Sequence, residues 1–211
     1  MTNDRALAAA ILAGGRARRL GGADKGALDV GGLRILDRQL EVLRRVASTV
    51  FIVGPESEAW RERGVRAVPD EIAGAGSLGG IYSAIIQSPV DRTLVVACDM
   101  PFLSAELFDR MAETDADLVI PRSRRGLEPL CAIYGKACAA DIRGRILRGE
   151  LQASTLPRHV RIAEIGPDVL SAYDSGGLLF MNVNTPHDYE RAKTLVELKR
   201  EPKQDRITTG E

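Results

Sequence analysis

The 211-residue chain has few of the residues that build disulfide frameworks, zinc sites or histidine-based catalysts. It contains three cysteines, and none of them lies in a CxxC pair. An odd number of cysteines at such spacing indicates neither a disulfide framework nor a zinc site, and it suits a reducing compartment. The two histidines, His159 and His187, lie in no motif that we can connect with chemistry.

The chain also lacks an excess of charge and a long apolar run. Basic and acidic residues each number 29, so the formal net charge is zero, which argues against a broad nucleic-acid-binding surface. The apolar run at residues 7–12 is too short for a membrane helix or a signal-peptide core. Hydrophobic residues still make up 45% of the chain, enough for a packed core. We therefore expect a cytoplasmic protein that binds neither nucleic acid nor membrane.

Short apolar segments alternate with amphipathic ones along the chain. The patterns predict strands at residues 8–13, 50–53, 65–68, 93–98 and 117–120, and helices at 35–46, 56–63, 77–87, from 104 onward and 186–200. Ser77 and Ser104 are expected to cap two of these helices. Such alternation predicts a Rossmann-like α/β fold, a three-layer sandwich with a mostly parallel sheet and helices on both faces. We expect one domain over residues 1–200 and a disordered polar tail at 201–211.

A glycine-rich loop follows the first predicted strand, at residues 14–25. Glycines such as Gly14 and Gly15 let the backbone approach a ligand and present N–H groups to it. Arg19 and Lys25 can neutralise phosphate charge. The loop could instead be a mobile surface segment with solvated charges. Adjacent glycines directly after a buried strand, with both cations within reach, favour phosphate binding, although the loop is not a Walker A motif.

Two acidic residues follow predicted strands, where ligands of parallel α/β folds bind. Asp99 ends the most apolar strand, and a carboxylate there can hold Mg²⁺ together with phosphate oxygens and water. A helix-capping role is the alternative, but Ser104 is available for it. Asp70 follows the strand at 65–68 and could contact a ribose, a base or the metal, or could simply be a turn residue.

Two asparagines precede the last predicted helix. Asn182 and Asn184 alternate, so in an extended segment their side chains point to the same side and could bind a polar acceptor. The alternative is that Asn184 or Thr185 caps the helix, with Pro186 in its first turn.

A literal GxGxxG occurs at residues 74–79, with Asp99 about twenty residues further on. This pattern would suit a dinucleotide-dependent oxidoreductase. However, it follows the third predicted strand and leaves both the first loop and the Asp99 turn unexplained. We favour a second loop that closes over a nucleotide.

Taken together, the motifs resemble those of the molybdenum cofactor guanylyltransferase family. They are LAGG at residues 12–15, Arg19, GGADK at 21–25, CDMP at 98–101 and NVNTP at 182–186, in matching order across nearly the whole chain. The resemblance implies the nucleotidyltransferase variant of the fold, GTP as donor and Mg²⁺ as cofactor. It further implies that the terminal phosphate of molybdenum-bound molybdopterin is the acceptor, that pyrophosphate leaves, and that proteins which make or accept this cofactor are partners.

The resemblance also implies a role for each matching residue. Arg19, Lys25 and Asp99 would be catalytic, with Asp99 also holding Mg²⁺. The expected nucleotide-binding and groove-lining residues are Leu12, Ala13, Gly14, Gly15, Gly22, Lys25, Asp70, Asp99, Asn182 and Asn184. An ionised phosphate acceptor needs no general base, which agrees with the low histidine count.

Three positions depart from the family pattern. Gly54 stands where an asparagine that contacts the nucleotide often follows the second strand, so either that contact is missing or the backbone replaces it. The loop at residues 76–80 lacks the usual proline, and Glu128 is unusual in a segment near the acceptor. Two other functions therefore remain open: a related enzyme that uses CTP or a sugar 1-phosphate, and a non-catalytic protein that binds a nucleotide or pterin.

Overall fold

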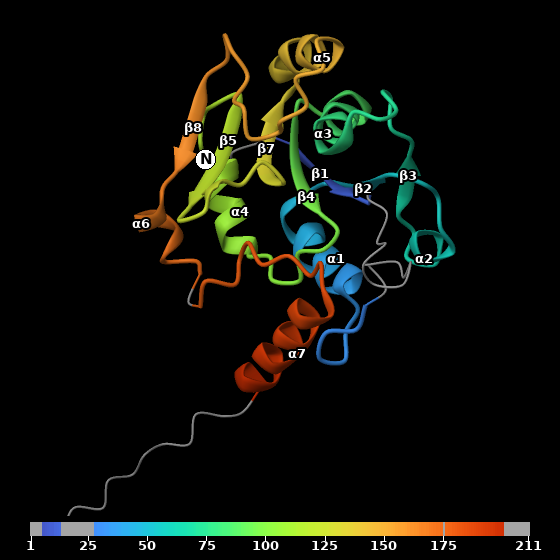
Figure 1. The fold of residues 1–211 in the computed structure, drawn as a ribbon, viewed down its shortest axis with the longest axis vertical. Coiled ribbons are helices and arrows are strands. Elements are labelled where there is room, and N and C mark those ends of the chain that lie inside the picture. The colour runs from blue at the N-terminus through green and yellow to red at the C-terminus, as the bar shows by residue number, and fades with distance from the viewer. Residues whose placement is uncertain (1–5, 14–27, 175, 201–211) are drawn as a thin grey trace, which may run out of the picture.

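The computed structural model describes residues 6–13, 28–174 and 176–200. Its centre is a twisted sheet with the strand order β3-β2-β1-β4-β7-β5-β6, and β8 pairs with β5 (Figure 1). Strands β1 to β4 run parallel, whereas β7 is antiparallel to both β4 and β5. The strands are β1 (Leu7–Leu12), β2 (Thr49–Val53), β3 (Arg66–Val68), β4 (Arg92–Ala97), β5 (Leu118–Ser123), β6 (Gly126–Leu127), β7 (Cys131–Gly135) and β8 (Ile162–Ile165).

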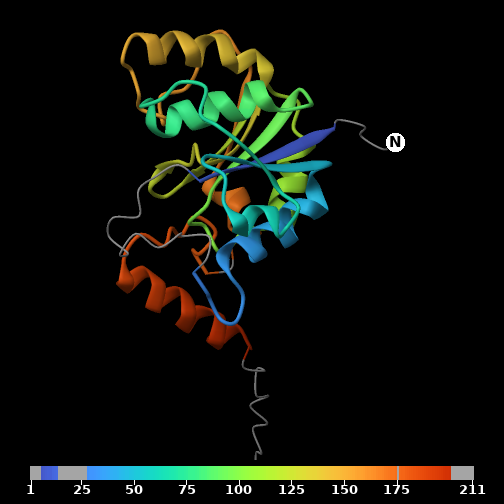
Figure 2. The same cartoon turned by 90° about the vertical axis from the view of Figure 1, so that its right-hand side faces the viewer.

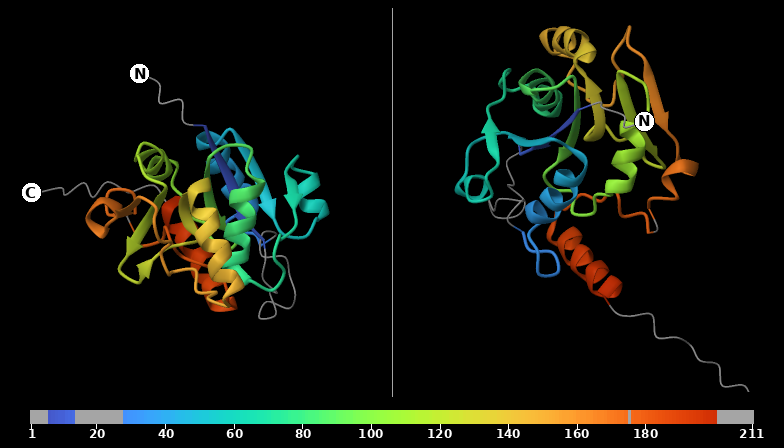
Figure 3. Two further views of the ribbon diagram at one scale, coloured as in Figure 1. Left: turned by 90° about the horizontal axis from the view of Figure 1, so that it is seen from above. Right: turned by 180° about the vertical axis from the view of Figure 1, so that it is seen from behind.

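Helices cover both faces of the sheet, which confirms the predicted three-layer α/β sandwich. Helices α3 (Gly76–Gln87) and α5 (Ala139–Leu147) lie side by side on one face, and α1 (Ile35–Val46) and α4 (Ala105–Ala112) cover the other (Figures 2 and 3). Shorter elements are α2 (Glu58–Arg61), the 3₁₀ turn η3 (Lys136–Cys138) and α6 (Pro167–Leu170). In the part of the chain that is described, no helix is both long and apolar enough to cross a bilayer.

The last helix, α7 (Pro186–Arg200), lies outside these layers, beyond α1 (Figure 2). Ala192 and Val196 of α7 belong to a small apolar cluster with Ile35, the first residue of α1, and with Val30 in the segment before it. Val183, which precedes α7, is fully buried in the same cluster. The C-terminal segment is therefore attached to the edge of the sandwich near the start of α1.

Strand β1 shows why this sequence forms a covered sheet. All six of its residues are buried, and alternate residues belong to the two main core clusters, one on each face of the sheet. Side chains alternate between the faces of a strand, so a strand covered on both sides must be apolar throughout. The uncharged stretches at residues 7–12 and 93–97 therefore correctly predicted strands that are buried on both faces, although β4 itself begins at the charged, buried Arg92.

The structure corrects two sequence-based expectations. Ser77 does not cap α3: the helix begins at Gly76, with Ala75 in the capping position and no capping bond from a side chain. Strand β7 is antiparallel within the mostly parallel sheet and was not predicted. Ser104, by contrast, caps α4 as expected, because its hydroxyl accepts a hydrogen bond from the Leu107 N–H at 3.1 Å.

Candidate active site

The carboxyl ends of β1, β2 and β4 form the edge of the sheet where the site was predicted. Leu12 pairs with Val53 on one side and with Ala97 on the other. Pairing continues past the strand, since the Ala13 N–H donates to the Val53 carbonyl at 2.9 Å and the Cys98 N–H donates to the Leu12 carbonyl at 3.2 Å. Leu12 and Ala13 therefore lie beside the turn that carries Asp99.

Five of the eleven predicted site residues are ones that the structure does not describe. Gly14, Gly15, Arg19, Gly22 and Lys25 all lie outside the described ranges. Their roles remain expectations from the sequence. What the structure adds is the position of the strand from which their loop departs.

A buried glutamine of α1 forms hydrogen bonds to the turn that follows β4. Gln39 of α1 is 1% exposed, and its Nε2 donates to the carbonyl oxygens of Ala97 at 2.7 Å and of Met100 at 3.0 Å. These two carbonyls flank Asp99, which is half-buried. Hydrogen bonds to both sides of the turn restrict the position of the Asp99 backbone. Sequence analysis missed Gln39, although an amide on the apolar stripe of a helix is itself a signal.

The C-terminal asparagines are brought to the same turn. The N–H of Val183 donates to the carbonyl oxygen of Asp99 at 2.8 Å. Met181 and Val183 are buried, whereas Asn182 is exposed and Asn184 is half-buried, so the two asparagines face outward from one extended segment. Both line a single cavity of about 830 Å³. The structure thus places the asparagine pair directly beside Asp99.

The cap of α7 is Thr185 and not Asn184. Thr185 Oγ1 accepts from the Asp188 N–H at 3.1 Å, and Asp188 Oδ2 accepts from the Thr185 N–H at 2.9 Å. This reciprocal pair satisfies the helix terminus in the manner of a capping box. Asp188 also accepts from the Asn184 N–H at 3.1 Å, which fixes the backbone of that residue. The hydrogen bond from Thr185 is the main cause that holds the pKa of Asp188 below its ordinary value.

Asp70 lies at the same edge of the sheet but further from Asp99, because β2 and β1 separate β3 from β4. The loop after it is anchored where the Glu71 N–H donates to Ser83 Oγ of α3 at 2.9 Å. Asp70 itself is exposed, yet partial desolvation raises the pKa of its carboxyl group. A bound cation or hydrogen-bond donor would reverse that direction.

Gly54 is required by the geometry at the end of β2. Its φ is +149°, and a Cβ atom there would lie 3.2 Å from the Cβ of Ala13. Its N–H donates to the Val68 carbonyl at 2.9 Å. The N–H of Gly54 is therefore already used within the sheet, which removes the most direct way for the backbone to replace the missing asparagine.

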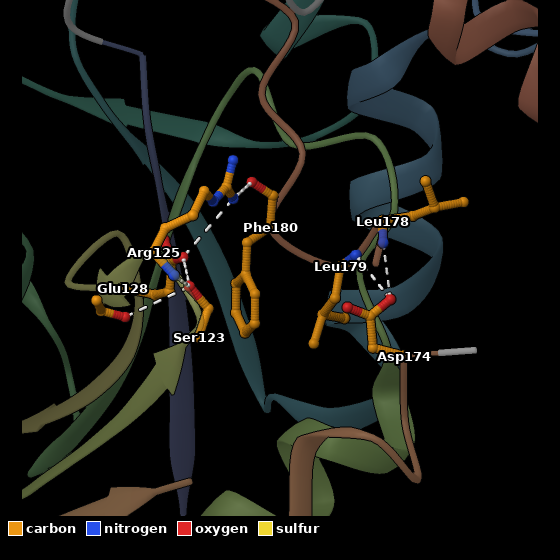
Figure 4. Close-up of polar contacts among 8 residues, drawn as sticks. Ser123, Arg125, Glu128, Asp174, Leu178, Leu179 and Phe180 are labelled. Carbon is orange, nitrogen blue, oxygen red and sulfur yellow. Dashed lines mark hydrogen bonds and ion pairs between the residues drawn. The ribbon is translucent and has the colours of Figure 1, made fainter. Parts of the chain in front are cut away.

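A second group of contacts joins the β5–β6 hairpin to the segment before α7 (Figure 4). The Arg125 side chain points at Phe180 and donates to its carbonyl oxygen, and it also lies 3.6 Å from Glu128 Oε1. Ser123 Oγ donates to the same Glu128 oxygen at 2.6 Å. The unusual Glu128 thus orients the arginine that holds the segment leading to Asn182. No sequence pattern signalled this contact, because its partner is a backbone carbonyl.

The two histidines do not line the cavity described above, although His187 is near enough to Asp188 to help lower the pKa of that carboxyl group. His159 and His187 are both exposed, and neither lines the cavity that contains the asparagines. His187 occupies the first turn of α7 and is exposed at the surface. The polar groups of the described part of the site are therefore carboxylates, amides, hydroxyls and arginines.

Known proteins with similar sequences point to one family. Residues 9–162 match the family model described as the MobA-like NTP transferase domain. The chain is 38% identical over 192 residues to a probable molybdenum cofactor guanylyltransferase of Pelotomaculum thermopropionicum, covering 90% of this chain and 93% of that protein. It is 28% identical over 198 residues to the molybdenum cofactor guanylyltransferase of Desulfosudis oleivorans, covering 92% and 98%.

Solved structures show the same fold. The crystal structure of molybdopterin-guanine dinucleotide biosynthesis protein A from Archaeoglobus fulgidus matches with a TM-score of 0.73 at 24% identity, covering 90% of this chain and 99% of that chain. The 2-C-methyl-D-erythritol 4-phosphate cytidylyltransferase of Thermus thermophilus matches with a TM-score of 0.61 at 16% identity, covering 89% and 98%. The family match spans most of the sheet, and the chain belongs to the molybdenum cofactor guanylyltransferase family of MobA-like nucleotidyltransferases.

Proposed function

We propose that this enzyme transfers GMP from GTP to the terminal phosphate of molybdenum-bound molybdopterin, in a reaction that depends on Mg²⁺. The observation that carries the proposal is the hydrogen bond between Val183 and Asp99. It sets the asparagine pair, which suits a polar acceptor, beside the strand end that suits a nucleotide. The names of the relatives support the guanine donor and the pterin acceptor.

The donor would lie across the carboxyl ends of the neighbouring strands β1, β2 and β3. Leu12 and Ala13 begin the glycine-rich loop, whose Gly14, Gly15 and Lys25 we assign to the phosphates of GTP. Asp70 is assigned to GTP as well. The start of α3 supports this placement, since it has no side-chain cap and Gly80 brings it close to Leu12. Uncapped helix N–H groups favour anions.

Asp99 is the residue that we assign to Mg²⁺. Among the described residues there is no cluster of three or more histidine, cysteine or acidic side chains that could enclose a metal on its own. One carboxylate at a strand end nevertheless fits Mg²⁺, which keeps several waters and is bound through one or two carboxylates plus substrate phosphates. When bound, the ion would neutralise charge on the phosphate oxygens.

The chemistry then requires little from side-chain acids or bases. An oxygen of the acceptor phosphate forms a bond to the α-phosphorus of GTP, while the bond between the α-phosphorus and the bridging oxygen breaks and pyrophosphate leaves. The acceptor phosphate is already ionised near neutral pH. Catalysis therefore consists mainly of positioning and charge stabilisation, which we assign to Arg19, Lys25 and Asp99.

The direct test is incubation of the protein with molybdopterin, Mg²⁺ and each nucleoside triphosphate in turn, followed by mass analysis and a pyrophosphate assay. We expect the guanine dinucleotide product and pyrophosphate with GTP. A product formed with CTP in preference to GTP would instead identify a cytidylyltransferase. Nucleotide or pterin binding without pyrophosphate release would contradict the catalytic proposal.

A further inference from the structure

The cavity that contains the asparagines extends well beyond them. Its volume is about 830 Å³, and its walls come from the β5–β6 hairpin, α6, residue 174, residues 176–184 and the first turns of α7. The inference drawn from it rests on the proposed function, since it concerns the acceptor. Asn182 and Asn184 flank Val183, which is bonded to the Asp99 turn, and other lining residues belong to the hairpin and to α6.

The charged residues that line this cavity are formally balanced, with three arginines and three aspartates. Several of these side chains already form hydrogen bonds or ion pairs with other residues of the chain. Arg125 donates to the Phe180 carbonyl and faces Glu128 (Figure 4). Asp174 Oδ1 accepts from the N–H groups of Leu178 at 2.8 Å and Leu179 at 3.2 Å. These contacts build the wall and leave little capacity for a ligand.

Asp188 is occupied in the same way, by the N–H groups of Asn184 and Thr185 and by the Thr185 hydroxyl. Two arginines remain. Arg124 on the hairpin and Arg191 on α7 are exposed and make no hydrogen bond or ion pair with any described residue. Asp168 of α6 is the one lining carboxylate without such a partner in the described part of the chain. Positive charges therefore outnumber negative ones among the charged lining groups that no described residue already pairs.

We propose that this cavity holds the part of the acceptor remote from the reacting phosphate, and that Arg124 and Arg191 bind an anionic group there. An arginine presents several N–H donors in a plane and pairs with anionic oxygens in a defined geometry. An acceptor with a phosphate at one end and a second anionic group at the other would bridge from the asparagines to these arginines. For molybdenum-bound molybdopterin, the second group is the metal-bearing end.

The proposal predicts both the direction and the size of the change in acceptor affinity that each substitution causes. Removal of either arginine charge weakens acceptor binding, whereas Asp168 opposes an anionic ligand, so its neutralisation leaves binding unchanged or strengthens it. If the cavity bound the acceptor through shape alone, the arginine and aspartate substitutions would not change the affinity in opposite directions. Arg122 provides a matched control, because it lies on the same hairpin, pairs with Glu164 at 2.5 Å and does not line the cavity.

The experiment measures binding of molybdenum-bound molybdopterin without nucleotide, and then the KM for this acceptor and the KM for GTP in the transfer assay. We expect Arg124→Gln and Arg191→Gln each to raise the acceptor Kd and KM about tenfold, with the KM for GTP unchanged. Arg122→Gln should match the wild type, and Asp168→Asn should bind at least as tightly. Thermal unfolding curves that match the wild type show that each variant is folded.

The outcomes separate the two proposals. Normal transfer with both arginine variants within twofold of the wild type overturns the cavity assignment alone. Wild-type binding that both variants lose, without any transfer, supports the cavity assignment and contradicts the transferase proposal. A wild type that neither binds nor modifies the acceptor overturns both. Tighter binding by an arginine variant, or weaker binding by Asp168→Asn, overturns the anionic assignment.

Discussion

The N–H of Val183 donates to the carbonyl oxygen of Asp99 at 2.8 Å, and this contact joins two segments far apart in the sequence. Val183 is fully buried, so the hydrogen bond is shielded from water and the segment cannot shift without exposing apolar surface. Asp99 and the two asparagines that flank Val183 therefore keep a constant relative position. For a reaction that depends on positioning, this shared frame is what the fold contributes.

Replacement of Asp99 by asparagine should lower Mg²⁺-dependent turnover by at least about 100-fold, because the side chain loses the charge that would hold the ion. The fold should survive, since the substitution keeps size and hydrogen-bonding capacity. Steady-state kinetics at several Mg²⁺ concentrations is the measurement. Asp91→Asn, just before the opposite end of β4, is the control and should behave as the wild type. Near-normal turnover of Asp99→Asn would remove Asp99 from the site.

Replacement of Gln39 by methionine should reduce kcat by about tenfold, since two carbonyls beside Asp99 lose their donor. The lost hydrogen bonds should also cost about 1–3 kcal/mol of unfolding free energy. Kinetics and urea denaturation together separate the two effects. The exposed Gln152→Met is the control, and kcat equal to that of this control would show that the turn does not depend on Gln39.

Replacement of Gly54 by alanine should destabilise the protein by about 1–3 kcal/mol and raise the KM for GTP, because the new Cβ meets Ala13 at the start of the glycine-rich loop. Gly64→Ala is a useful comparison. Gly64 also has a positive φ, but open space surrounds it, so its cost is the backbone strain alone. Equal effects of the two substitutions on stability and on the KM would argue against crowding at Ala13.

Replacement of Asp188 by alanine should cost about 1 kcal/mol at pH 7, the usual value of a helix cap. The pKa of Asp188 is lowered in the folded protein, so its contribution is present above the pKa of the unfolded chain and is lost as pH falls through the folded value. The difference in unfolding free energy between wild type and variant should therefore shrink below about pH 4. Urea titrations across this range test it, with the exposed Asp109→Ala as control. A constant difference would contradict the role of the ionised carboxylate.

Replacement of either histidine by glutamine should leave turnover within a few-fold of the wild type. Both side chains are exposed and lie outside the cavity, and a phosphate nucleophile needs no base. The pH dependence of kcat/KM in the double variant His159→Gln/His187→Gln should keep the wild-type shape. A collapse of activity in either single variant would refute the mechanism based on metal and charge.

Much of the scaffold could be predicted from local patterns. The helix predicted at residues 35–46 has those bounds in the structure, because its apolar residues recur at the spacing that places them on one face of a helix. The capping role of Ser104 followed from residue type alone. The antiparallel direction of β7 could not be predicted, since its apolar run pairs equally well in either direction until its neighbours are known. Ser77 was misassigned because the capping position lies two residues earlier, at Ala75, and the helix already begins at Gly76.

In the candidate site, too, some features could be predicted from the sequence and others required the tertiary structure. The sequence by itself determined that Asp99 ends a buried strand and that Asn182 and Asn184 share one side of an extended segment, because both properties depend on neighbouring residues. Only the tertiary structure decided that these two segments touch, that Gln39 holds the turn and that Arg125 holds the hairpin to Phe180. Those contacts involve backbone carbonyls, which every residue carries, so only the folded arrangement selects which of them meet.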